Sequence, residues 1–289
     1  MQKSKLTLKT KDALTGGAFM LPWLIGLLVF TMYPFFYSIW LSLCQVEFTP
    51  NGIATTFVGF KWYAEAFTAD ANFIKNMTST MESIIFSTPM IVVAAVILAL
   101  LLNRSLRGRA FFRVLYFFPV IIISGPVMSK LMGNDATTIV HPDQYAIYQV
   151  LEGLPELIST PLLYIFDNIV LILWYSGVQM LIILAGLQKI GDPIYEAASI
   201  DGAGAWEKFW KITLPYLRPM ILVSAAYTIV DLSGMTTTKM HTHIVNNMMN
   251  TIKPYSYSSA LSWLYALAVL IVLGIMFLIL MERRPRRGK

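Results

Sequence analysis

Long apolar blocks separated by short polar segments dominate the chain. Six of these blocks are long enough to cross a hydrocarbon core of about 30 Å, which takes about 20 helical residues. They cover about 18–43, 83–102, 111–132, 161–187, 219–238 and 259–281. The pattern predicts an all-α, polytopic membrane protein with six transmembrane helices, and residues 1–289 are expected to form a single transmembrane domain.

The composition agrees with this interpretation. The chain is 56% hydrophobic and only 13% charged, whereas soluble domains are about 25% charged. A net charge of +6 could suggest nucleic acid, but the basic residues lie at the ends of the apolar blocks, where they set membrane orientation. Cys44 is the single cysteine, so neither an internal disulfide nor a cysteine metal site is possible. The first block is too long for a cleavable signal peptide and is expected to remain as the first span.

The distribution of Lys and Arg predicts the orientation. Basic residues gather at the N-terminus, between the second and third spans, and at the C-terminus, whereas the loops 44–82 and 133–160 are balanced or acidic. With six spans the three basic segments fall on one side, which the positive-inside rule identifies as the cytoplasm. Both termini and the segment 188–218 are therefore expected to be cytoplasmic.

A charged and patterned segment, YEAASIDGAGAWEKFWKITLP, lies between the fourth and fifth apolar blocks. Asp192 is expected to cap a short helix that has Pro193 at its first position. Gly202 can take the left-handed conformation that ends such a helix. A second short helix, about 205–212, is expected to end ahead of Pro215. We call residues 192–215, two short helices bent at a glycine, the elbow.

The first helix of the elbow allows two interpretations. Ala197 and Ala198 leave room for another backbone, and Glu196 offers a charge to a partner, as in a helix that docks into a groove. The alternative is a helix lying on lipid headgroups, and the aromatic residues of the second helix, Trp206, Phe209 and Trp210, favour that alternative there. For the first helix the pattern leaves both open.

The elbow also carries a family resemblance. Glu196-Ala197-Ala198, followed by Gly202 and then by Ile212-x-Leu214-Pro215, resembles the EAA motif of permease subunits in binding-protein-dependent ABC importers. The similarity continues through WYSGVQMLIILAGLQKIGDPIYEAASIDGA and NRSLRGRAFFRVLYFFP. The first span and the segment YSSALSWLYAL resemble the carbohydrate-uptake, maltose-type branch of this family.

The resemblance implies a type I ABC importer permease fold in a bacterial inner membrane, with the elbow as the coupling helices that dock on a cytoplasmic ATPase subunit. The implied coupling residues are Glu196, Ala197, Ala198, Asp201, Gly202, Ala203, Ile212, Leu214 and Pro215. It further implies a second permease subunit, two copies of the ATPase subunit and an extracytoplasmic solute-binding protein that delivers a sugar or oligosaccharide.

The chain itself is not expected to be an enzyme. It contains no G-x-x-x-x-G-K-[ST] phosphate loop. ATP and Mg are therefore expected to bind the partner ATPase, and no cofactor is expected in this chain.

Four polar residues fall within or beside the predicted spans and are candidates for a substrate path: Asp167, Asn168, Gln179 and Asp231. Polar groups at membrane depth are costly and usually face a cavity or a partner helix. Lining of the path and hydrogen bonding between helices therefore both remain open. The segment 231–257 fits the family pattern poorly. It contains His241-x-His243, two residues more typical of a polar loop than of a metal site, and no metal site is expected.

Three other functions compete, one of which is a structural membrane scaffold without transport. The same permease fold could import another solute, such as a phosphate ester or an amino acid. A secondary transporter driven by an ion gradient would instead predict paired carboxylates in the membrane and inverted repeats. The sequence shows no such repeat, and that function would leave the elbow unexplained.

Overall fold

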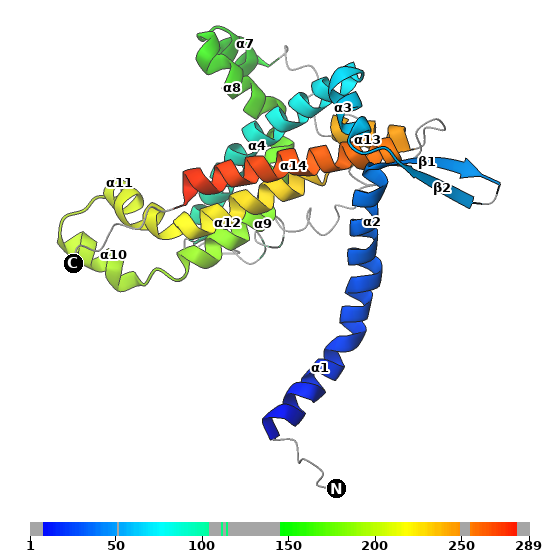
Figure 1. Cartoon of the computed structure of the whole chain (residues 1–289). Helices are drawn as coiled ribbons and strands as arrows, with labels where there is room; N and C mark the ends of the chain where they lie inside the picture. Colours follow the sequence, from blue (N-terminus) through cyan, green and yellow to red (C-terminus); the bar gives the residue numbers. More distant parts are fainter. Residues whose placement is uncertain are drawn as a thin grey trace, which may run out of the picture. The chain divides into compact units, whose positions relative to one another are not determined.

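A computed structural model describes residues 8–50, 52–103, 111, 114, 145–248 and 255–281 (Figure 1). The chain divides into two compact units. Unit 1 comprises Met1–Ile74 and His243–Tyr265, and unit 2 comprises Lys75–Thr242 and Ala266–Lys289.

Unit 1 begins with a long helical run and continues with a hairpin and a short helix. Its elements are α1 (Leu8–Leu27), the π-helical η1 (Leu28–Met32), α2 (Tyr33–Ser42), β1 (Cys44–Thr49), β2 (Gly52–Phe57) and α3 (Lys61–Thr68). The first residues of α4 (Ala71–Asn103), most of α13 (Lys239–Met248) and the start of α14 (Ser256–Leu280) complete it.

The hairpin departs from the all-α prediction, which assigned residues 44–82 to a loop. Strands β1 and β2 pair antiparallel, with Cys44 opposite Phe57. Cys44 and Val46 are buried whereas Glu47 is exposed, the period-two alternation of a half-buried strand. The backbone N–H of Val46 also donates to Ser256 Oγ at 2.8 Å. Burial of alternate residues of β1 attaches this strand to unit 1, whereas Phe57 on β2 is exposed.

The regular elements of unit 2 are all helices in its described residues. It contains α4 from Lys75 onward and the rest of α14, together with α7 (Ala146–Glu152), α8 (Glu156–Asp167), α9 (Ile169–Leu187), α10 (Asp192–Ile200), α11 (Ala205–Lys208), the π-helical η3 (Phe209–Thr213) and α12 (Leu214–Ser233). Helices α9 and α12 run side by side (Figure 1).

Five helical segments are long and apolar enough to cross a membrane: Thr15–Ser42, Ala71–Asn103, Ile169–Leu187, Ala205–Ser233 and Ser256–Leu280. They correspond to five of the six predicted spans. The remaining span, 111–132, lies outside the described residues apart from Phe111 and Val114. A mostly helical membrane protein is therefore confirmed, and the count of six and the side of the termini stay predictions.

The helices at the predicted fourth and fifth spans have other limits than the apolar blocks. The segment 161–187 is interrupted at Asn168, where α8 has ended and α9 has not begun. Asn168 has φ −109° and ψ 11°, and its side-chain Nδ2 donates to the carbonyl oxygen of Tyr164 at 2.9 Å. This local bond competes with regular helix geometry. At the predicted fifth span, 219–238, helix α12 begins five residues earlier, at Leu214, and ends at Ser233, ahead of Gly234.

Buried apolar side chains join α4, α9 and α12 at the end of α9 that leads into the elbow. We call this set the elbow core: Ala95, Val96, Leu98, Ala99, Leu102, Met180, Ile183, Leu184, Leu187, Ile190 and Leu217. Gly186 lies at a close contact between α9 and α12, because a Cβ built there would be 2.7 Å from Met220 Cγ. The two helices therefore need a residue without a side chain at this position.

Candidate functional site

Helix α10 forms the first half of the elbow and presents its motif residues to solvent. Glu196 and Ala197 are exposed and Ala198 is half-buried. Ile200, at the end of the helix, is 86% exposed. The cap differs by one residue from the prediction: Gly191 is the N-cap and Asp192 lies inside the first turn. Asp192 still favours the helix, because a carboxylate in the first turn interacts well with the helix dipole.

The bend of the elbow has the predicted glycine geometry. Gly202 has φ +82°, in the left-handed region that glycine adopts most readily. The N–H of Ala203 bonds the carbonyl of Ala198 at 2.9 Å, and the N–H of Gly202 bonds that of Ser199 at 3.1 Å. This pair of bonds is the Schellman motif that ends many α-helices. The prediction for Gly202 as the bend is confirmed.

The second half of the elbow does not stop at Pro215 as predicted. Helix α11 passes through η3 directly into α12, so one helical run extends from Ala205 to Ser233. A proline deprives the preceding turn of a regular hydrogen bond. The π-helical turn of η3 accommodates the change, with the N–H of Leu214 bonding the carbonyl of Phe209. Pro215 and Pro219 thus lie within a helix.

Side-chain bonds hold the two halves of the elbow together. Lys208 Nζ donates to Ser199 Oγ at 2.6 Å. Thr213 Oγ1 donates to the carbonyl of Lys208 at 3.2 Å, so the hydroxyl of Tyr195, 2.9 Å away, can donate to Thr213. Tyr195 also packs against the elbow core. Helix α10 is therefore attached both to the start of α12 and to the buried cluster that joins α4, α9 and α12.

The predicted path residue Gln179 lies inside the helix bundle. Its side chain is 0% exposed, and Nε2 donates to Thr228 Oγ1 on α12 at 2.8 Å. Thr228 Oγ1 in turn donates to the carbonyl of Ser224 at 2.8 Å. This is the arrangement expected of a residue that bonds between helices. Gln179 is not among the residues that line the cavity described next.

A cavity of about 240 Å³, lined by both polar and apolar side chains, opens at the other end of α9. Three serines of α4 line it, Ser79, Ser83 and Ser87, which lie at helical spacings and so share one face. The remaining lining residues come from α4, from Asn168 and α9, and from the region between α12 and α13: Thr80, Ile84, Ile91, Asn168, Leu171, Ile172, Tyr175, Leu232, Met235, Thr237, Thr238 and Lys239.

The other path candidates differ in their relation to this cavity. Asn168 lines it, at the interruption between α8 and α9. Asp231 is half-buried on α12, next to the lining residue Leu232, and interacts electrostatically with Tyr175. Asp167 is exposed at the end of α8 and is not among the lining residues. Lys239 is a lining residue that the sequence pattern did not single out, and its Nζ donates to Ser79 Oγ at 3.3 Å.

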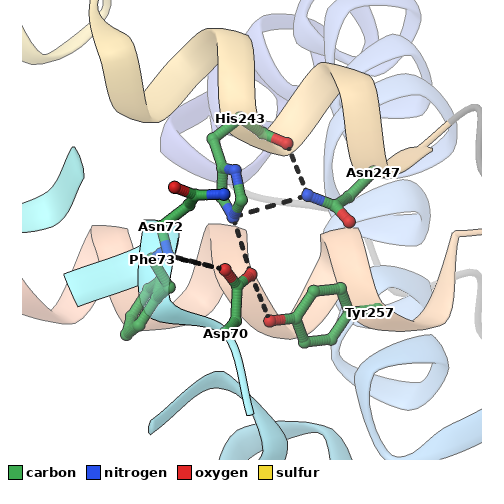
Figure 2. Close-up of polar contacts among 6 residues, drawn as sticks. All are labelled: Asp70, Asn72, Phe73, His243, Asn247 and Tyr257. Atoms are coloured by element: carbon green, nitrogen blue, oxygen red, sulfur yellow. Dashed lines mark hydrogen bonds and ion pairs between the residues drawn. The ribbon is translucent and has the colours of Figure 1, made fainter. Parts of the chain in front are cut away.

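A separate polar cluster in unit 1 centres on Asp70 (Figure 2). Asp70 Oδ1 caps α4 by accepting the backbone N–H groups of Asn72 at 3.0 Å and Phe73 at 3.1 Å. Oδ2 accepts the hydroxyl of Tyr257 at 2.7 Å and lies 2.8 Å from His243 Nε2. Burial alone would raise the pKa of Asp70, but the hydrogen bonds from Tyr257 and His243, the charge of His243 and the N–H of Phe73 hold that pKa below its ordinary value.

This cluster gives His243 a structural role that its position in the sequence did not reveal. The imidazole is directed at Asp70, and the Asn247 side chain donates to the His243 carbonyl at 2.9 Å (Figure 2). His241 makes a backbone bond to Thr238 Oγ1 at 3.2 Å. In the part of the chain that the structure describes, no group of three or more His, Cys, Asp or Glu residues could hold a metal ion.

Comparison with known proteins identifies a family. Residues 66–286 match the family described as "Binding-protein-dependent transport system inner membrane component". The chain is 30% identical to the probable ABC transporter permease protein YesP of Bacillus subtilis, over 94% of this chain and 91% of that protein. It is 31% identical to the trehalose/maltose transport system permease protein MalF of Thermococcus litoralis, over 78% and 75% of the two chains.

Two further matches cover nearly the whole length of this chain. The lactose transport system permease protein LacF of Rhizobium radiobacter is 27% identical over 97% of this chain and 99% of its own. A bacterial alginate ABC transporter, solved in complex with an alginate-bound periplasmic protein, matches with a TM-score of 0.64 at 20% identity, over 95% and 96% of the two chains. At that identity the structural match shows the fold alone. The chain belongs to the family of inner membrane components of binding-protein-dependent transport systems.

Proposed function

We propose that the chain is the permease subunit of an ATP-driven importer for a sugar or an oligosaccharide. Several relatives are named for such solutes, including trehalose and maltose, lactose, and arabinooligosaccharides. An extracytoplasmic binding protein delivers the solute, and a second permease subunit completes the path. Two copies of a cytoplasmic ATPase subunit bind ATP and Mg and supply the driving force. Both termini and the elbow face the cytoplasm.

The observation that carries this proposal is the combination of exposure and attachment in α10. Glu196, Ala197 and Ile200 are exposed, as a docking surface requires. The same helix is bonded to the start of α12 through Tyr195 and Thr213 and packs on the elbow core. A partner that moves α10 therefore moves three membrane helices with it, because packed interiors transmit displacement with little compression.

In this mechanism the cavity lies on the extracytoplasmic side, at the end of α9 opposite the elbow. Hydroxyl groups of Ser79, Ser83 and Ser87 suit the hydroxyls of a sugar, since each can both donate and accept a hydrogen bond. Closure of the two ATPase subunits on ATP rotates the helices through the elbow. The cavity then opens toward the binding protein, and ATP hydrolysis returns it to the inward-facing state.

The test is charge reversal at the elbow. In cells that produce the complete importer, Glu196→Lys is expected to abolish uptake of the labelled solute and co-purification of the ATPase subunit, while the chain still inserts in the membrane. The matched control is Glu152→Lys, an exposed acid on α7, which should leave uptake unchanged. If Glu196→Lys retained both uptake and co-purification, the docking role of α10 would be wrong.

One observation favours a second candidate solute. Lys239 places an ammonium group beside the cavity hydroxyls, and Lys binds phosphate as a point charge. A relative at 25% identity is the sn-glycerol-3-phosphate transport system permease protein UgpA of Rhizobium meliloti. Competition between labelled maltose and unlabelled glycerol phosphate for uptake separates the two, because only the importer's own solute will compete at low concentration.

A further inference from the structure

The first turns of the helical run Ala205–Ser233 carry an exposed aromatic face. Trp206 is 73% exposed and Trp210 is 48% exposed. The two rings meet edge to face, with centroids 5.5 Å apart, because residues four apart lie on the same side of a helix. Tryptophan has a large apolar ring and a polar N–H group. Exposed tryptophans of this kind therefore favour an environment that is neither bulk water nor pure hydrocarbon.

The length of this run places the face relative to a membrane. The run has 29 residues, and at 1.5 Å per residue it is about 43 Å long. A bilayer is about 40–45 Å thick when its headgroup regions are included. When the apolar part of α12 occupies the hydrocarbon core, Trp206 and Trp210 therefore reach the level of the headgroups, where tryptophan is enriched in membrane proteins.

The charges around this face fit an anionic lipid surface. Lys211 and Arg218 are exposed on the same run, and Lys208 is half-buried. Lys211 Nζ lies 3.2 Å from Glu207 Oε1, an exposed pair on neighbouring turns. Basic residues beside interfacial aromatics are attracted by the negative potential of a cytoplasmic leaflet.

Helix α10 has a different surface although it lies only a few residues away. Its aromatic residue, Tyr195, turns inward to Thr213. Its most exposed apolar side chain is Ile200, and aliphatic side chains lack the polar group that suits tryptophan to headgroups. The two halves of the elbow therefore offer surfaces of different chemistry.

We propose that α11 and η3 form a lipid anchor, with Trp206 and Trp210 among the headgroups of the inner leaflet and Lys211 against anionic lipid. The side of the membrane rests on the proposed function. The ATPase subunit contacts α10, and the anchor keeps the start of α12 at a fixed depth. The anchor resists movement of the elbow along the membrane normal, so displacement of α10 becomes rotation and tilt of α12.

The anchor is tested by site-directed spin labelling of the full chain in vesicles of phosphatidylcholine and phosphatidylglycerol. Cys44 is first replaced by alanine, and a single cysteine is then placed at Trp206, at Trp210 or, as the matched control, at Ile200. Nitroxide labels at 206 and 210 should have a higher ratio of collisions with oxygen to collisions with a water-soluble nickel chelate than the label at 200. Oxygen concentrates in lipid and the chelate in water, so a label in bulk water has the lowest ratio.

The outcomes separate the anchor from the proposed function. A membrane-impermeant thiol reagent that reaches Ile200→Cys only in inverted vesicles places the elbow in the cytoplasm, whereas reaction in intact cells overturns the proposed orientation. If position 200 is cytoplasmic but position 206 is as accessible to the nickel chelate as position 200, only the anchor is wrong. If the ATPase subunit, rather than lipid, shields position 206, the surface binds protein and the anchor is again wrong.

A second measurement leaves Cys44 in place. Lipids brominated near the headgroup quench tryptophan fluorescence only at short range. The chain with Trp206→Phe and Trp210→Phe should lose part of the quenching seen in the natural chain, and replacing phosphatidylglycerol by phosphatidylcholine should reduce the quenching of the natural chain. Equal fractional quenching in the two chains would contradict the anchor.

Discussion

The two ends of helix α9 are built in opposite ways. At the elbow end, Gly186 and the elbow core leave no space even for a methyl group, since a Cβ at Gly186 would meet Met220 Cγ at 2.7 Å. At the other end, serine and threonine side chains line a cavity of about 240 Å³ together with apolar residues. A filled apolar interior transmits movement, and an open, partly polar one accommodates a solute or water. One helix thus combines a rigid connection to the elbow with an adaptable site.

Filling the tightly packed elbow end of α9 should give the largest loss of stability and of uptake. Gly186→Leu is expected to destabilise the protein by about 1–3 kcal/mol, the usual cost of overpacking, and to abolish uptake. Thermal unfolding in detergent and uptake in cells measure the two effects. Gly274→Leu is the control, because no atom lies within 4 Å of a Cβ built at Gly274. Equal stability of the two variants would contradict the tight contact between α9 and α12.

Filling the open end should affect transport and leave stability nearly unchanged. Ser83→Leu places an apolar side chain in the cavity, where it occupies existing space. We expect uptake to fall several-fold with a change in unfolding free energy within about 0.5 kcal/mol. Ser83→Ala, which leaves the space open, should retain more uptake. A large loss of stability in Ser83→Leu would show that this end is as tightly packed as the other.

The bond between Gln179 and Thr228 lies between the two ends and should have an intermediate effect. Thr228→Val leaves the buried Gln179 Nε2 without its partner. The expected loss is about 0.6 kcal/mol, the average for side-chain hydrogen bonds within membranes, and at most about 1.7 kcal/mol. Adding Gln179→Leu should recover part of that loss, and a double-mutant cycle in detergent measures the coupling. Purely additive losses would mean that the bond contributes nothing.

The smallest effect on stability is expected at the Asp70 cluster of unit 1. Unlike the cavity at the end of α9, this cluster is a set of polar side chains bonded to one another. Because the folded-state pKa of Asp70 lies below its ordinary value of about 3.9, its contribution to stability is complete above that value. The contribution is lost as the pH falls through the folded-state pKa. Unfolding temperatures between neutral pH and pH 3 should therefore fall less steeply for Asp70→Asn than for the natural chain. Parallel curves would contradict the role of the carboxylate.

Much of the architecture follows from local pattern. Five long apolar helices appear where apolar blocks predict them, and Gly202 bends the elbow as its neighbours indicate. The hairpin was missed although it had a signal, since alternation in residues 44–49 and the dipeptide Asn51-Gly52 are typical of a strand pair. The register of β1 against β2, by contrast, depends on which other side chains bury Cys44 and Val46.

Other features depend on contacts between distant residues, which periodicity does not reveal. His243 and Asp70 are 173 residues apart in sequence, so nothing near either residue predicts their bond. The choice between path lining and interhelical bonding for Gln179 depends on which helix faces it, and that helix is α12. The continuous helix through Pro215 depends on a π-helical turn that helix-start and helix-stop signals do not describe.

The bend of the elbow depends on the chirality of the residue at position 202. No atom lies within 4 Å of a Cβ built at Gly202, so space does not exclude a side chain there. Only the handedness of natural residues does, because an L-residue in the left-handed region costs about 1–2 kcal/mol. D-alanine, introduced by chemical ligation, would adopt the same φ without that cost and would restrict the unfolded chain. A mirror-image residue would thus keep the bend, and an L-alanine of identical size would strain it.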